Sequence, residues 1–197
     1  MLSSIEKEKV DPRVTRTRNL LIDAFVSLQA EKSFDDITIQ DIATRATVNR
    51  ATFYAHFPDK YALLDDIMRT GFGQMLQGRL GRHTDTTQEH LQDLFLAVTD
   101  YLTALEARCK RSYQMFESLV EAQVKAQLRE QVRAWLSRLP STRAQPSQRL
   151  DLAATLMSWS IYGAALEWRN QAGAQPAESF ANEALPLIAS LATALEK

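Results

Sequence analysis

The sequence predicts an all-α protein of about nine helices, with an N-terminal three-helix domain followed by a larger helical domain. Apolar residues recur at the spacing of a 3.6-residue helix, and no stretch alternates apolar and polar residues between hairpin signals, as strands would. Most prolines fall between the periodic segments, where helices begin or end. We expect two domains, residues 13–60 and 61–197.

The first helix is expected at residues 13–31, directly after Pro12. One stripe of its apolar residues can face a core: Leu20, Leu21, Ala24, Phe25 and Leu28. Two short helices follow, at 38–45 and 49–56. Their start signals are Thr38 and Asn49, residue types that cap helix N-termini. A bracing helix followed by two short helices with a tight turn between them predicts a helix-turn-helix over residues 38–57.

Longer helices are expected in the rest of the chain, at 59–80, 88–107, 110–118, 120–138, 147–171 and 177–195. Pro186 falls inside the last of them, where it should kink or split the helix. Gly71, Gly73 and Gly78 lie in the helix at 59–80, and each interior glycine costs roughly 1 kcal/mol of helix stability relative to alanine. They mark either the end of that helix or a softened hinge.

Composition excludes several classes of protein but does not identify a partner. With 45% hydrophobic and 24% charged residues, the chain is typical of a folded globular protein. The formal net charge is −1, so a case for DNA must rest on geometry. The single cysteine, Cys109, excludes an intrachain disulfide and suits a reducing cytoplasm, which is the location we expect. The apolar-rich stretch 152–166 is shorter than the ~20 residues that a bilayer span requires.

Residues 14–64 resemble the DNA-binding domain of the TetR family of transcriptional regulators. The family pattern combines a threonine-capped helix, an Ile-Ala pair, a turn, a Tyr-x-His-Phe run and a lysine that opens the next helix. The matching residues here are Thr38, Ile42, Ala43, Thr47, Val48, Tyr54, His56, Phe57 and Lys60. The chain departs from the pattern at Thr47, where the family usually has a glycine that adopts positive φ easily.

The resemblance and the chemistry of the side chains together suggest roles at DNA. Thr38 would cap its helix and bring a backbone N–H to a phosphate, and Gln40 would approach a base edge. Arg50 is the best base reader, because a guanidinium pairs bidentately with guanine. The remaining expected DNA contacts are Asn49 and Thr52 to bases or phosphates, and Tyr54, His56 and Lys60 to phosphates. Alternatively, Tyr54 and His56 only cover the small core.

The resemblance also implies an effector cavity and a dimer interface in the larger domain. Plausible cavity walls are Phe72, Met75, Tyr101, Tyr113, Phe116 and Trp159, although each is as readily a plain core residue. The helix at 147–171 is apolar on more sides than one chain of this length should cover. We therefore expect the last two helices of each chain to form a four-helix bundle, with Leu156, Tyr162, Leu187 and Leu191 at the interface.

The sequence thus predicts a homodimeric, DNA-binding transcriptional regulator, a repressor that a small apolar or aromatic effector releases from a palindromic operator. Two alternatives remain: a similar regulator controlled by a protein partner, and an all-α carrier or enzyme that does not bind DNA. The sequence holds no phosphate-binding loop and no nucleophile motif, so we expect no catalytic residue, no cofactor and no metal site.

Overall fold

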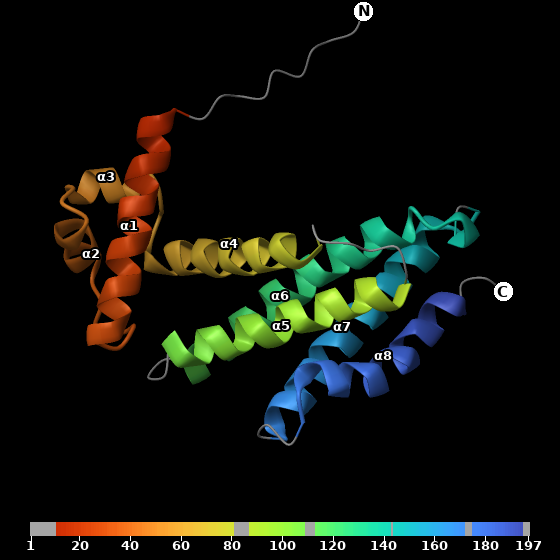
Figure 1. Ribbon diagram of the computed structural model, residues 1–197. Coiled ribbons are helices and arrows are strands. Elements are labelled where there is room, and N and C mark those ends of the chain that lie inside the picture. Colours follow the sequence, from red (N-terminus) through yellow and green to blue (C-terminus); the bar gives the residue numbers. More distant parts are fainter. Residues whose placement is uncertain (1–10, 81–86, 109–112, 143, 172–174, 195–197) are drawn as a thin grey trace, which may run out of the picture. The chain divides into compact units, whose positions relative to one another are not determined.

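The computed structural model describes residues 11–80, 87–108, 113–142, 144–171 and 175–194 (Figure 1). Within these ranges the chain forms eight α-helices and one short 3₁₀ turn, and no strand. The chain divides into two compact units, one ending at Ile67 and the other starting at Met68. The division falls inside α4 (Lys60–Leu80), so one continuous helix contributes residues to both units.

The N-terminal unit consists of α1 (Pro12–Glu31), α2 (Ile39–Arg45), α3 (Arg50–Tyr54) and the start of α4. Asp11 caps α1 by accepting a hydrogen bond from the N–H of Arg13 at 2.8 Å, and Pro12 occupies the first turn. Fully buried side chains from all these segments form one core: Leu21, Phe25, Phe34, Ile37, Ile42, Phe53 and Leu63. This core fixes the two short helices, which are too short to be stable alone.

The turn between α2 and α3 contains the one non-glycine residue with positive φ in the described part of the chain. Thr47 has φ of 58°, a left-handed conformation that a β-branched side chain rarely adopts. Two hydrogen bonds hold it, from Thr47 N to Thr44 O at 3.1 Å and from Val48 N to Ala43 O at 2.9 Å. The turn therefore keeps the geometry of a glycine turn at the cost of local strain.

Thr47→Gly should raise the free energy of unfolding by about 1 kcal/mol, because the strain of a left-handed threonine exceeds the extra chain entropy of glycine. Urea denaturation of the two proteins measures the difference. Thr44→Gly is the control, since it adds the same flexibility inside α2 and should destabilise. Equal losses in both variants would contradict the assignment of strain to Thr47.

The C-terminal unit contains the rest of α4, followed by α5 (Thr87–Arg108), α6 (Tyr113–Leu136), the 3₁₀ turn η1 (Pro140–Thr142), α7 (Ser147–Asn170) and α8 (Ala177–Thr193). α7 packs against α5, α6 and α8, so it is the central helix of this unit. Its core includes Phe72, Leu94, Phe95, Val124, Leu128, Met157 and Ile161. None of the helices in the described ranges has a stretch long and apolar enough to span a bilayer.

One expectation about helix boundaries is wrong, and of the kink or split expected at Pro186 the split does not occur. The segments predicted as separate helices at 110–118 and 120–138 form the single helix α6 from Tyr113, because no glycine or proline interrupts them. α8 is not split at Pro186, which lies on its exposed face. The carbonyl that loses its helical bond there belongs to exposed Asn182, and water can satisfy it. The buried stripe of Ala181, Leu185 and Ile188 holds the helix across the proline.

Candidate nucleic-acid interface

A complete capping box closes the N-terminus of α2. Thr38 Oγ1 accepts a hydrogen bond from Asp41 N–H at 3.1 Å, and Asp41 Oδ2 accepts one from Thr38 N–H at 2.8 Å. Hydrogen bonds from Lys32, at 2.9 Å, and from Thr38 hold the pKa of Asp41 well below its usual range. Thr38 therefore caps α2 as the sequence predicts, but its own N–H is already bonded and is not available to a phosphate.

The second short helix presents exposed polar side chains at its N-terminus. Asn49 caps α3, and its Oδ1 accepts hydrogen bonds from the backbone N–H of Thr52 at 2.7 Å and from its hydroxyl at 2.9 Å. Arg50 is exposed and lies beside Tyr54, with 3.4 Å between guanidinium and hydroxyl. Its guanidinium is 6.0 Å from the centre of the Tyr54 ring, and Tyr54 is 48% exposed. Arg50 and Tyr54 thus form one outward-facing pair on α3.

The other predicted contacts differ in exposure. Gln40 is exposed on α2, where its amide donates to the hydroxyl of Thr44 at 3.0 Å. His56 is half-buried, with its ring 6.5 Å from that of buried Phe57. Lys60 is also half-buried, and its ammonium donates to three backbone carbonyls of the loop before α2. Lys60 therefore departs from the free phosphate-binding cation that the sequence predicts, because its donors are used within the protein.

Two further cations in this unit are neutralised by acids distant in the sequence. Arg18 on α1 lies 2.6 Å from the buried carboxylate of Asp66 on α4, and its guanidinium stacks 4.5 Å above the Phe57 ring. Arg45 donates bidentately to Glu31 at 2.7 and 2.8 Å, which lowers the pKa of Glu31 and raises that of Arg45. These pairs fasten α4 and α2 to α1. Sequence spacing gave no signal for them, because the partners lie on different helices.

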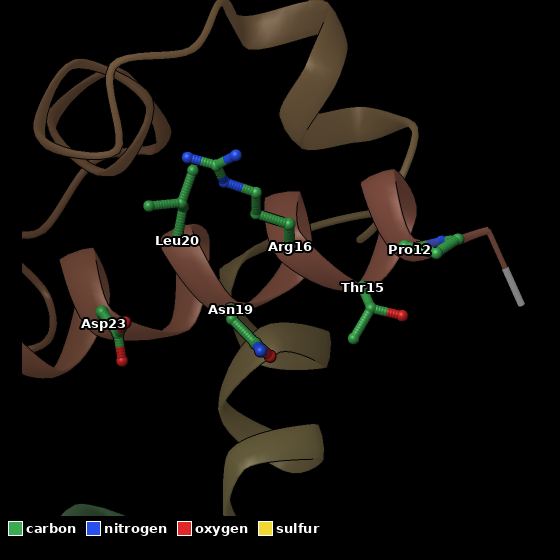
Figure 2. A pocket seen from close by; sticks show the side chains of 6 residues that line it. All are labelled: Pro12, Thr15, Arg16, Asn19, Leu20 and Asp23. Carbon is green, nitrogen blue, oxygen red and sulfur yellow. The ribbon is translucent and has the colours of Figure 1, made fainter.

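The cations without an acidic partner are fewer than the composition suggests. Arg13, Arg16 and Arg50 are exposed and form no ion pair with any described residue. Arg16 borders a shallow depression of about 550 Å³ on the outer face of α1 (Figure 2). The depression is lined by Pro12, Thr15, Arg16, Asn19, Leu20 and Asp23. Because it is open and mixes both signs of charge, it indicates an exposed helix face rather than a ligand pocket.

Only some of the residues predicted to line an effector cavity are buried, and one of them lies on the surface. Phe72 and Tyr101 are buried side by side, with ring centroids 5.2 Å apart, and the Tyr101 hydroxyl donates to Met68 O at 3.1 Å. Phe116 is buried and Met75 half-buried, whereas the side chain of Tyr113 lies outside the described residues, as does Cys109. Trp159 departs from the expectation, since 57% of it is exposed on the surface of the protomer.

The residues predicted at a dimer interface also differ in how far they are exposed. Leu187 is 75% exposed on α8, Leu156 is exposed on α7, and Leu191 is half-buried. Tyr162 departs from the expectation because it is buried within the protomer, with the ammonium of Lys125 5.3 Å from the centre of its ring. The exposed stripe of α7 is instead formed by Leu152, Leu156 and Trp159, one helical turn apart from each other.

One family of known proteins matches part of the N-terminal unit. The family described as bacterial regulatory proteins, tetR family, matches residues 21–67. The uncharacterized HTH-type transcriptional regulator YxbF of Bacillus subtilis is 41% identical over 73 residues, which cover 36% of this chain and 19% of YxbF. The HTH-type transcriptional repressor KstR2 of Mycobacterium tuberculosis is 31% identical over 93 residues, 46% of each chain. The matches thus span less than half the length of these curated relatives.

Solved structures share the fold over nearly the whole chain. A putative transcriptional regulator from Pseudomonas aeruginosa PAO1 aligns with a TM-score of 0.61 and 16% identity, covering 98% of this chain and 95% of that one. RolR, solved in complex with resorcinol, aligns with a TM-score of 0.58 and 23% identity, covering 94% and 95%. The match at residues 21–67 and the names of the curated relatives lead to one conclusion: the N-terminal unit carries the helix-turn-helix domain of the tetR family of bacterial regulatory proteins.

Proposed function

We propose that this protein binds double-stranded DNA as a homodimer, represses transcription from a near-palindromic operator, and is released by a small apolar or aromatic effector. The observation that carries the proposal is the outward face of α3, where Arg50 projects beside Tyr54 without an acidic partner among the described residues. A short capped helix with a free guanidinium at its N-terminal end suits the major groove.

Arg50→Ala should weaken specific binding by about 1–3 kcal/mol and relax the preference at one base position of each half-site, because a bidentate arginine discriminates guanine from other bases. Competition binding with duplexes that carry single substitutions measures both effects. Arg50 is exposed, so Arg50→Ala should unfold at nearly the wild-type temperature, and thermal unfolding of the variant is the control for local unfolding. A uniform loss across all sequences in Arg50→Ala would contradict the base-reading role.

A homodimer is favoured by exposed apolar side chains on adjacent helices. Leu152, Leu156 and Trp159 on α7 and Leu187 on α8 are all more than 40% exposed, and α7 packs against α8. Large apolar side chains gathered in this way usually mark a protein interface. A two-fold dimer would read two half-sites about one helical turn apart or slightly more, which provides the specificity that one helix-turn-helix lacks.

The effector proposal rests on chemistry of the C-terminal unit. Phe72, Tyr101 and Phe116 supply aromatic side chains from α4, α5 and α6. RolR, which shares the fold, was solved with resorcinol, an aromatic compound. An aromatic or apolar ligand among such side chains would gain from burial and ring contacts.

Selection of bound duplexes from a random pool by the full-length protein tests the DNA-binding proposal. The expected product is one near-palindromic sequence, and an unenriched pool would overturn the proposal in favour of a carrier that does not bind DNA. A thermal-shift screen of small aromatic and apolar compounds then tests the effector, since ligands that bind the folded state raise its stability. A regulator controlled by a protein partner would show no shift with any of them.

A further inference from the structure

Lys60 occupies a position where a lysine is normally unfavourable. It is the first residue of α4, and the N-terminus of a helix carries a partial positive charge that repels cations. Its ammonium is nevertheless fully engaged, donating to the carbonyls of Phe34 at 2.9 Å, Asp35 at 3.1 Å and Ile37 at 2.9 Å. An ammonium has three N–H donors, so the three carbonyls use all of them. The ammonium also lies 4.5 Å from the centre of the Phe34 ring.

The carbonyls converge because the loop between α1 and α2 turns with its apolar side chains inward. Phe34 and Ile37 are fully buried. The backbone N–H and C=O groups of this loop therefore lie near the core and need hydrogen-bond partners within the protein. One internal bond, from Ile37 N to Phe34 O at 3.2 Å, satisfies part of this need. Lys60 adds one hydrogen bond to each of the three carbonyls of Phe34, Asp35 and Ile37. The loop and the first residue of α4 are thus one hydrogen-bonded assembly.

The assembly continues directly into the helix-turn-helix. The peptide that joins Ile37 to Thr38 is held at both ends, its carbonyl by Lys60 at 2.9 Å and its N–H by Asp41 at 2.8 Å. Thr38 caps α2, so the point where α2 begins is fixed by Lys60 from one side and by Asp41 from the other. α2 packs against α3, which carries Arg50, and the turn between them is held by the hydrogen bond from Val48 N to Ala43 O at 2.9 Å.

We propose that Lys60 is a positioning residue for DNA recognition: it holds the loop at residues 34–37 and the start of α2 against the first turn of α4, and it contacts no phosphate. This inference rests on the proposed function, because positioning matters for DNA only if α2 and α3 bind it. It assigns Lys60 a role opposite to the exposed phosphate-binding cation that its position in the sequence pattern predicts.

The chemistry of arginine and lysine separates the two roles. A phosphate contact requires a flexible positive charge, and arginine supplies one at least as well as lysine. Three converging carbonyls require a compact group with three donors in a tetrahedral arrangement, and a planar guanidinium is too large to replace it. Lys60→Arg should therefore preserve binding if Lys60 contacts a phosphate, and should weaken binding if Lys60 positions the loop.

Salt dependence supplies an independent readout. Within the described residues of the N-terminal unit, Arg13, Arg16 and Arg50 are the cations that have neither an ion pair nor a set of carbonyl partners. In a dimer these three arginines would together contribute about −5 to the slope of log K against log salt concentration. Arg16→Met is the matched control, since it removes one exposed charge from each subunit and should reduce the slope by about 1.8. Lys60→Met should leave the slope unchanged, because its ammonium displaces no counterion from DNA.

The experiment measures binding of the selected duplex at several salt concentrations for the wild type, Lys60→Arg, Lys60→Met and Arg16→Met. We expect both Lys60 variants to bind about tenfold more weakly, with the wild-type slope, after loss of the carbonyl contacts. Wild-type affinity in Lys60→Arg would overturn the inference, and so would a slope reduced by about 1.8 in Lys60→Met. If the wild type binds no duplex, the proposed function itself fails, which is a different outcome from either of these.

A measurement on the wild type covers the case in which the Lys60 variants do not fold. Competitive acetylation of the DNA-free protein, read by peptide mass spectrometry, reports how far each lysine is engaged. Lys60 should react at least tenfold more slowly than Lys32, which has a single carboxylate partner and no carbonyl cradle. Equal reactivity of the two lysines in the absence of DNA would overturn the inference.

Discussion

Leu187→Glu should convert the proposed dimer to a folded monomer and reduce binding to the proposed two-site operator at least a hundredfold. In the protomer Leu187 is 75% exposed on α8, so a glutamate there costs the isolated chain almost nothing. In a two-fold interface the substitution would place two carboxylates in an apolar contact, where burial of a charge is strongly unfavourable. Loss of the second binding site then removes the gain from simultaneous contact with both half-sites.

Sedimentation at micromolar concentration, circular dichroism and duplex binding together check this result. Ala107→Glu is the matched control, because it adds the same charge at an exposed position of α5 and should remain a dimer. Gly163→Leu gives a second, uncharged test. Gly163 is exposed, and a Cβ built there meets no atom within 4 Å beyond its chain neighbours and the nearby backbone of α7, so we expect the single chain to accept a larger side chain that would obstruct a partner. A Leu187→Glu protein that remained dimeric would show that the exposed faces of α7 and α8 serve another contact.

The sequence predicted the elements of the N-terminal unit well because their determinants are local. Pro12 in the first turn of α1, Thr38 as the cap of α2 and Asn49 as the cap of α3 all lie within a few residues of the groups they satisfy. The left-handed residue at Thr47 likewise belongs to a turn of local hydrogen bonds. Patterns of this length are visible in the sequence without knowledge of the tertiary fold.

The environment of the charged residues could not be predicted because their partners are distant in the sequence. Arg18 and Asp66 are 48 positions apart, and Lys60 reaches carbonyls 23 to 26 residues earlier. Backbone carbonyls carry no sequence signature, so nothing in the residue types distinguishes a lysine that binds them from one that binds phosphate. The residue types therefore gave no sign that Arg18, Arg45 and Lys60 are engaged within the protein.

The outward face of α7 was ambiguous for a different reason. A helix that is apolar on nearly every side gives no periodic signal to separate the face that packs internally from the face that remains exposed. Tyr162 and Trp159 are only three residues apart, yet Tyr162 is 2% exposed and Trp159 is 57% exposed. The positions of α5, α6 and α8 decide between them, and those positions are set by long-range packing.

His90 is the remaining group with a large expected effect. It lies on α5, where only 3% of its surface is exposed, and its ring stacks on Trp135 of α6 with centroids 5.0 Å apart. Neither ring nitrogen has a hydrogen-bond partner among the described residues. Burial, with a smaller contribution from the positive charge of Arg138, lowers the pKa of His90 from 6.5 to about 4. The imidazole is therefore neutral at pH 7 and buried without satisfying its polar atoms.

His90→Phe should stabilise the protein at pH 7 by about 1–3 kcal/mol, because it removes two unsatisfied buried nitrogens and keeps the ring that stacks on Trp135. The substitution should also remove part of the acid sensitivity. Between pH 6.5 and 4 the unfolded chain binds a proton at His90 that the folded chain does not. The contribution of neutral His90 to the free energy of unfolding is therefore fully present above pH 6.5. It decreases as the pH falls toward 4, by about 3 kcal/mol in total.

Urea denaturation of the wild type and His90→Phe at pH 7, 5.5 and 4.5 measures both effects, since other titrating groups cancel in the difference between the two proteins. The stability advantage of the variant should grow steadily as the pH falls. His90→Leu, which is smaller than phenylalanine, guards against overpacking of the site. A difference that stayed constant with pH in both variants would mean that His90 keeps an ordinary pKa in the folded protein, and that its burial against Trp135 is relieved in solution.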